Sequence, residues 1–239
     1  MNEKLKDDII VALKDNNYPL VLSLINDSVS LHSFFFRYAI GVKNIGFIDF
    51  YLKQNLAVDL DYYYLLSFSA RTSSPEILTL LLNQTLFNTK ENFQAALITA
   101  IDSNNIACLN VLLGFVEYPF NGTSLLRQAC STKYTDSINI LLSRNFTYDK
   151  DFNPFYMLLH NEYFFYYKYT EVLHHLFNVF NLSMNNNEAF KSAQFFNNQD
   201  VIKMFWNEAC VKSTLMNDCP ELYRCFIKLD IQRKINQFL

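Results

Sequence analysis

Apolar and polar positions recur along this chain with a period of about thirty residues. In each period a small residue is followed, thirteen positions later, by the last residue of an apolar pair. A fixed period of about 20–50 residues indicates stacked supersecondary units rather than one closed globule. The pattern occurs six times, at Ala12 and Ile25, Ala39 and Leu52, Ser69 and Leu82, Ala100 and Leu113, Ala129 and Leu142, and Ala193 and Trp206.

Within one period the pattern predicts two short helices joined by a polar turn. In the fourth period a short helix is expected over 92–101, where Leu97 and Ala100 share one face at a spacing of three. The polar segment 102–105 then interrupts the helix, and a second helix is expected over 106–115. Its apolar stripe is too broad for one neighbour to cover, so we expect the pairs to stack. The small residue lets the second helix approach the first.

The same plan extends over nearly the whole chain and predicts a single all-α repeat domain over residues 1–239. The expected units are 5–27, 31–55, 61–84, 92–115, 121–144, 152–180 and 187–208, with a C-terminal cap over 213–239. Polar residues at both ends are typical of terminal units, so we expect both caps to be present and the chain to be complete.

Each turn inside a pair needs a residue that tolerates left-handed backbone geometry. Asparagine is the usual substitute for glycine at a helix C-terminus. We therefore expect the asparagines of these turns to supply this residue, namely Asn16-Asn17, Asn44, Asn104-Asn105 and Asn197-Asn198. In the third period, Ser74 before Pro75 predicts a helix start, because serine can cap and proline at the first helical position loses no needed donor.

Two stretches of the chain match motifs of a known repeat family. Residues 121–130, Asn-Gly-Thr-Ser-Leu-Leu-Arg-Gln-Ala-Cys, are similar to N-G-x-T-P-L-H-x-A-A, and residues 107–113 are similar to L-x-x-V-x-x-L-L. The chain thus resembles the ankyrin repeat family over about seven units. The resemblance implies a helix-pair solenoid of about seven to eight repeats. No unit carries the full T-P-L-H motif and glycine is scarce, so we expect the fingers between repeats to be short or irregular.

The sixth period departs from the others. The spacing from Leu159 to Phe177 is 18 instead of 13, and the turn segment 160–169 contains six aromatic residues. Exposed aromatic clusters are typical binding anchors, which predicts a partner-binding patch. Alternatively, the segment lengthens one or both helices and packs on a neighbouring unit. The candidate residues are Tyr163, Phe164, Phe165, Tyr166, Tyr167 and Tyr169, with Tyr62 and Tyr63 before the third unit as a second group.

Composition narrows the classes of partner. The chain is 51% hydrophobic and 18% charged, which is typical of a folded protein. The net charge is −3 and the basic residues form no run, so we expect no nucleic-acid binding. No apolar run reaches about 18 residues, so we expect no membrane insertion. The five cysteines are odd in number and widely spaced, which favours a reducing compartment, namely the cytoplasm.

The sequence offers no constellation for catalysis. Cys219 and Cys225 lack metal-ligand spacing, and His160-Asn161-Glu162 only superficially resembles a deaminase motif. We therefore expect no metal, no cofactor and no enzyme activity. The expected function is a protein-protein interaction module that binds another protein through its concave face and the sixth-unit aromatics. Likeness to small ankyrin-like proteins of viruses, protists and intracellular bacteria implies a host-directed modulator. The alternatives are an enzyme grafted on a helical solenoid and a structural or oligomerising subunit.

Overall fold

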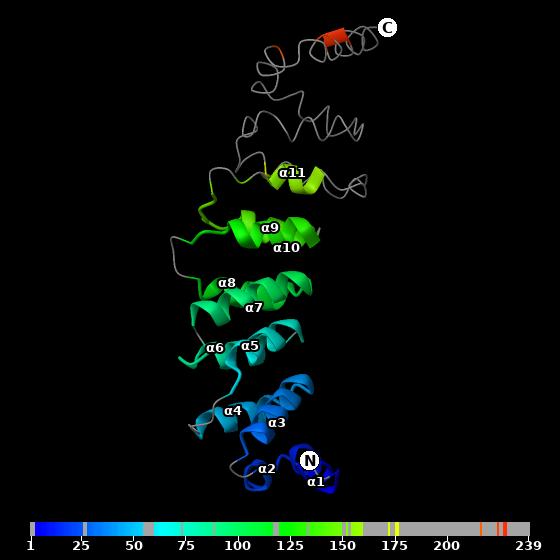
Figure 1. Cartoon of the computed structure of the whole chain (residues 1–239), viewed down its shortest axis with the longest axis vertical. Coiled ribbons are helices and arrows are strands. Elements are labelled where there is room, and N and C mark those ends of the chain that lie inside the picture. The colour runs from blue at the N-terminus through cyan, green and yellow to red at the C-terminus, as the bar shows by residue number, and fades with distance from the viewer. Residues whose placement is uncertain are drawn as a thin grey trace. The chain divides into compact units, whose positions relative to one another are not determined.

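The computed structural model describes most of the first 159 residues. The described segments are 3–25, 28–54, 60–72, 74–87, 89–116, 120–132, 134–149, 152 and 154–159, followed by the single residues 172, 175, 176, 216, 224, 227 and 228. The chain divides into two compact units, Met1–Glu117 and Tyr118–Leu239. All eleven elements of the described segments are α-helices (Figure 1), which confirms the predicted all-α class.

The first compact unit, Met1–Glu117, consists of four helix pairs that follow one another along the chain. Its helices are α1 (Glu3–Lys14), α2 (Tyr18–Ile25), α3 (Val29–Gly41), α4 (Ile45–Lys53), α5 (Tyr62–Arg71), α6 (Pro75–Leu82), α7 (Lys90–Asp102) and α8 (Ile106–Gly114). Within each pair the two helices pack together. Between pairs, α3 packs on α5 and α5 on α7, while α2, α4, α6 and α8 pack successively. First helices and second helices therefore form two separate layers.

The second unit begins with a further helix pair. It contains α9 (Thr123–Thr132), α10 (Thr135–Leu142) and α11 (Pro154–Leu159), and α9 packs on both of the others. An isolated parallel bridge joins Asn121 to Thr147, so the segment before α9 lies beside the segment after α10. The Gly122 N–H donates to the Thr147 carbonyl at 2.9 Å, and the Asn121 amide donates to Asp149 at 2.7 Å.

The small residue of each described pair is buried, as the pattern predicts. Ala12, Ala39, Ser69, Ala100 and Ala129 are each 3% exposed or less. The apolar residues thirteen positions later are also buried, except Leu52, which is half-buried. Interiors are close-packed, so no space is left at the small positions for a larger side chain.

Ala100→Leu is expected to lower the free energy of unfolding by about 1–3 kcal/mol, because Ala100 is fully buried and extra methylenes strain a packed core. Urea denaturation measures the change. Ala107→Leu places the same side chain at an exposed position of α8, where a change within about 0.5 kcal/mol is expected. Equal stability of the two variants would mean that α7 and α8 do not cross closely at Ala100.

Three turns inside the pairs share one backbone motif. The residue four positions after the small residue adopts positive φ, at Asn16 (57°), Lys43 (57°) and Asn104 (50°). The N–H of the next residue donates to the carbonyl of the small residue at 2.8–2.9 Å, which closes a Schellman motif. The prediction is confirmed for Asn16-Asn17 and Asn104-Asn105, each through its first asparagine, and wrong for Asn44, because Lys43 takes the left-handed position. Asn44 instead caps α4 and accepts a hydrogen bond from the Phe47 N–H at 2.9 Å. Asn197-Asn198 lie outside the described residues.

Candidate protein-binding surface

Of the aromatic residues predicted as binding anchors, two lie within the described part of the chain. Tyr62 and Tyr63 lie in the first turn of α5. The sixth-unit group lies outside the described residues and remains a prediction, namely Tyr163, Phe164, Phe165, Tyr166, Tyr167 and Tyr169.

The first turn of α5 separates its tyrosines. Asp61 caps the helix by accepting a hydrogen bond from the Tyr64 N–H at 2.9 Å. Successive helical residues point in different directions, so Tyr62 packs edge-on against Phe87, with ring centroids 4.8 Å apart, while Tyr63 is 55% exposed. Tyr62 is therefore largely a packing residue, and Tyr63 is available at the surface.

The next residue, Tyr64, belongs to a cluster of aromatic and cationic side chains on the layer of first helices. Tyr64 is 41% exposed and stacks on Phe68, one helical turn later, with ring centroids 5.8 Å apart and planes at 10°. The Arg37 guanidinium of α3 lies 5.5 Å from the Tyr64 ring centroid and 5.9 Å from that of Phe34. We call these four residues, Phe34, Arg37, Tyr64 and Phe68, the Arg37 patch.

The backbone of α3 and α5 explains why these side chains meet. Phe34 and Arg37 are three positions apart on α3, while Tyr64 and Phe68 are four apart on α5, so each pair lies on one helix face. The helices themselves pack together. The Phe68 ring also lies over Gly41, where an added Cβ would be 3.8 Å from it. Each helix thus contributes one side of the patch.

Arg37 carries the charge of this surface. Its side chain is exposed, and no carboxylate within the described segments pairs with it. Each ring contact is worth about 0.5–1 kcal/mol at an exposed site and holds the guanidinium in place. The planar group carries five N–H donors in a fixed fork that matches a carboxylate. The patch can therefore bind an acidic group and an apolar surface together.

The buried titratable groups of the first unit belong to the core. The ring Nδ1 of His32 lies 2.8 Å from the Tyr51 hydroxyl, and both side chains are buried. Burial, and to a smaller extent the nearby Tyr62, raises the pKa of Tyr51 above its usual range. This pair links α3 to α4 and has no access to a ligand from solvent.

The two described cysteines are buried free thiols. Burial raises the pKa of Cys108 above its ordinary value and raises that of Cys130 to about 12. The thiolate is the reactive form, so neither side chain is a nucleophile near neutral pH. Over the described part of the chain, no three metal-ligating side chains come together. In the same part, no helix combines the length and hydropathy that crossing a bilayer requires.

The residues of the Arg37 patch were not predicted as binding residues, although the repeat contains a signal for them. Phe34 and Tyr64 each stand five positions before the small residue of their pair, Ala39 and Ser69. Residues at one repeat position in consecutive pairs lie near each other when the pairs stack. Aromatic residues at this shared position therefore indicate a common surface.

Comparison with known proteins does not place the chain in a family. A scan against family models, a search of curated proteins and a search of solved structures each found no match. The likeness to ankyrin repeats thus remains a prediction from the residues, and the helix pairs and the Arg37 patch are the observations from which function is inferred.

Proposed function

We propose that this protein is a non-catalytic interaction module, an ankyrin-like helix-pair solenoid that binds a partner protein through the Arg37 patch. The observation that carries this proposal is the Arg37 guanidinium, held against the exposed Tyr64 ring and the half-buried Phe34 ring and without an acidic partner within the described segments. Tyrosine and arginine are enriched among the residues that dominate binding energy at interfaces.

The repeat geometry supports the ankyrin-like part of the proposal. Helix pairs recur at about thirty residues, each with a buried small residue, and the first four pairs stack in two layers. Stacked repeats generally present an extended surface for binding. The first helices α3 and α5 supply the patch, which corresponds to the concave face of such an array.

The chemistry of the patch defines the partner surface. A carboxylate of the partner forms two parallel hydrogen bonds with Arg37, while an apolar or aromatic side chain covers the stacked rings of Tyr64 and Phe68. These rings bury much area at low cost in side-chain entropy, since they have only two rotatable bonds. The partner is therefore a protein with an acidic residue beside an apolar one.

A second binding site and the cellular location are proposed from the sequence. The sixth-unit aromatics provide a second anchor, and the free thiols Cys108 and Cys130 fit a reducing compartment. We place the protein in the cytoplasm, which for a host-directed modulator is the cytoplasm of the host cell. The host-directed role is an analogy that rests on the resemblance of the sequence to small ankyrin-like proteins.

Affinity capture with the full chain and quantitative mass spectrometry tests the proposal. The double variant Arg37→Glu, Tyr64→Ser should lose at least about tenfold in recovery of specific partners, because a truncated anchor typically costs 1–2 kcal/mol or more, about tenfold in affinity. Both positions are exposed, so the variant should keep its helical circular dichroism. A third sample, with residues Tyr163, Phe164, Phe165, Tyr166 and Tyr167 changed to serine, tests the sixth-unit anchor separately.

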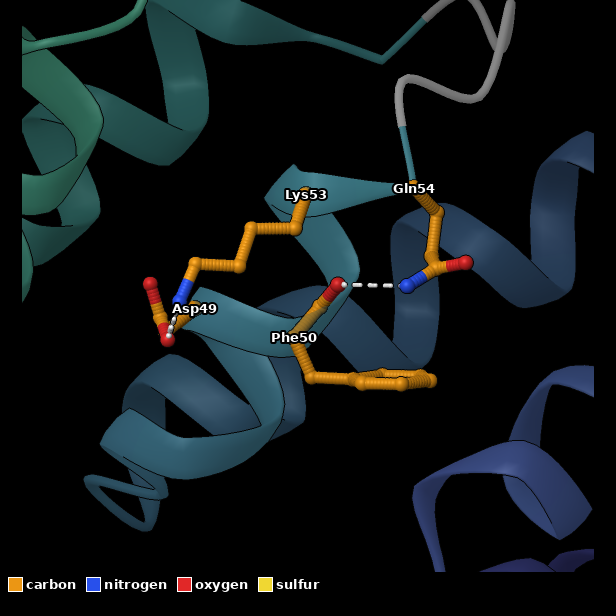
Figure 2. A network of polar contacts seen from close by, with 4 residues as sticks. All are labelled: Asp49, Phe50, Lys53 and Gln54. Carbon is orange, nitrogen blue, oxygen red and sulfur yellow. Dashed lines mark hydrogen bonds and ion pairs between the residues drawn. The ribbon is translucent and has the colours of Figure 1, made fainter.

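Lys53→Glu is the matched control, with the same charge reversal on the layer of second helices. Figure 2 shows Lys53 reaching back to Asp49, 2.6 Å away, at the end of α4, where the Gln54 amide donates to the Phe50 carbonyl at 3.3 Å. Exposed pairs of this kind contribute little to stability. Unchanged partner recovery by the folded Arg37→Glu, Tyr64→Ser chain would refute the assignment of the patch.

A further inference from the structure

The α1–α2 pair carries an open hollow of about 390 Å³. Two apolar side chains in it are unusually accessible, Val11 at 55% and Leu20 at 42%. The hollow is lined by Asp8, Val11, Ala12, Asp15, Asn17, Leu20 and Leu24.

The same positions are buried in every later pair of the first unit. Leu20 and Leu24 stand eight and twelve positions after the small residue Ala12. Their equivalents are Phe47 and Tyr51, Ile77 and Leu81, and Cys108 and Leu112, all of them buried. The contacts from α2 to α4, from α4 to α6 and from α6 to α8 run along this layer. The hollow therefore corresponds to the surface that, in each later pair, packs against the pair before it. Within the described segments no helix pair precedes α1, so this surface is open.

A hydrogen bond repeated between pairs shows how a helix is held at this surface. The Asn44 Nδ2 donates to the Leu13 carbonyl at 3.2 Å, and the Asn105 Nδ2 donates to the Ala70 carbonyl at 2.7 Å. Leu13 and Ala70 lie in the last turns of α1 and α5, where helical carbonyls lack intrahelical donors. Each asparagine thus binds the C-terminal turn of the first helix of the preceding pair.

Asn17 occupies the same repeat position in the first pair, five residues after Ala12. Its Oδ1 accepts a hydrogen bond from the Leu20 N–H at 3.3 Å, as a cap of α2. Its side chain is exposed in the hollow, and its Nδ2 donates to no other described residue. The donor that binds a helix C-terminus elsewhere in the stack is therefore available here.

The hollow differs from its internal equivalents in charge. Asp8 stands four positions before the small residue, where Phe35, Leu65 and Ala96 are buried in later pairs. Asp8 and Asp15 are both exposed, and no cationic side chain in the described segments pairs with either. Lysine and arginine are favoured in the last turn of a helix by its dipole, so a basic last turn suits both the carboxylates and the helix.

We propose that this hollow binds a basic amphipathic helix of a partner protein, seated by its C-terminal turn. A last-turn carbonyl of that helix accepts from Asn17 Nδ2, and a lysine or arginine of the same turn pairs with Asp8 and Asp15. The apolar stripe of the helix covers Val11 and Leu20. The site is separate from the Arg37 patch, and either can fail without the other.

A phage-displayed library of helical peptides, randomised at its apolar and last-turn positions and selected on the full chain, tests this inference. We expect enrichment of peptides with lysine or arginine in the last turn. Leu20→Asp should weaken the binding of a synthesised copy of an enriched peptide at least about tenfold, since it removes a large apolar contact. Selection on the Asp8→Lys, Asp15→Lys chain should instead enrich glutamate or aspartate in that turn.

Three matched variants localise the binding. Asn17→Ser keeps an N-cap and adds no charge, but its side chain is too short to donate to the bound helix, so it should weaken binding of the enriched peptide about fivefold or more. Val29→Asp changes an equally exposed apolar residue outside the hollow and should leave binding unchanged, as should Arg37→Glu. Circular dichroism and thermal melting confirm that each variant is folded.

Several results would overturn the proposal. One is the absence of enriched peptides, and another is enrichment without a basic preference or with full binding to Leu20→Asp. A third is self-association of the chain that Leu20→Asp abolishes in light scattering, because the occupant would then be a second copy.

Discussion

Asn105→Leu is expected to lower the free energy of unfolding by about 2–4 kcal/mol. The buried Asn105 side chain accepts from the Cys108 N–H at 3.2 Å and donates to the Ala70 carbonyl at 2.7 Å. Loss of an N-cap costs about 1 kcal/mol, and a buried carbonyl left without its donor costs about 1–3 kcal/mol more. Urea denaturation followed by circular dichroism measures the difference.

Asn17→Leu provides the control for this prediction. Asn17 caps α2 in the same way but bridges to no preceding helix, so its replacement should cost only about 1 kcal/mol. The additional loss of unfolding free energy in Asn105→Leu measures how much the hydrogen bond from Asn105 to Ala70 contributes to stability. If the two variants lose equal stability, the hydrogen bond from Asn105 to Ala70 does not hold the pairs together.

Between about pH 8 and about pH 10.5, the wild-type chain should lose about 2 kcal/mol more stability than Cys130→Val. Burial raises the pKa of Cys130 from 9.0 to about 12. In the unfolded chain the thiol ionises above about pH 9, whereas the folded thiol stays protonated up to about pH 12. The stability that depends on the neutral thiol is thus complete below pH 9 and is lost as the pH rises to 12, at about 1.4 kcal/mol per unit.

The comparison isolates Cys130 from other groups that ionise at high pH. Burial raises the pKa of Tyr51 above its usual range, and burial together with the nearby Cys130 raises that of Tyr148 to about 12. Tyr51 is present in both proteins and cancels in the difference. Tyr148 also cancels up to about pH 10.5, because the folded Cys130 is still a neutral thiol there and does not act on the tyrosine. Valine has a similar volume and no ionisable group. Denaturation curves under a reducing agent give the two pH profiles. Parallel profiles would contradict the burial of Cys130 in the folded state.

The sequence was enough to predict the helix pairs, because their cores depend on local apolar stripes. The helices expected over 92–101 and 106–115 correspond to α7 and α8, at Lys90–Asp102 and Ile106–Gly114. Pro75 begins α6 as predicted, although the Ser74 side chain makes no capping hydrogen bond. Such boundaries follow from residues within one helical turn, which the linear pattern contains.

The bridges between pairs were not predicted, since they join residues more than thirty positions apart. The paired asparagines were interpreted only as turn residues. In the structure the two asparagines of one turn have different roles. Asn104 adopts the left-handed conformation, while Asn105 caps α8 and donates a hydrogen bond to the Ala70 carbonyl. Where a single asparagine was available, capping took precedence and Lys43 adopted positive φ. Stacking geometry, which no local pattern specifies, decides between these roles.

The candidate binding surface was predicted only in part, for a similar reason. Tyr62 and Tyr63 were selected as neighbours in sequence, but the helix turns them in different directions and only Tyr63 is well exposed. The contact between Arg37 and Tyr64 spans two repeats and depends on how α3 and α5 pack. Side chains brought together across repeats become visible only when equivalent repeat positions are compared.

The asparagine hydrogen bonds between helix pairs also affect how such a chain can gain further pairs. Asn44 and Asn105 each bond to a backbone carbonyl, a group that every residue supplies. A duplicated helix pair inserted between two others would therefore find a matching partner on each side, whatever its outward-facing side chains. Gene duplication can lengthen this kind of array without a new core, and the exposed residues of each copy are then left to diverge toward different ligands.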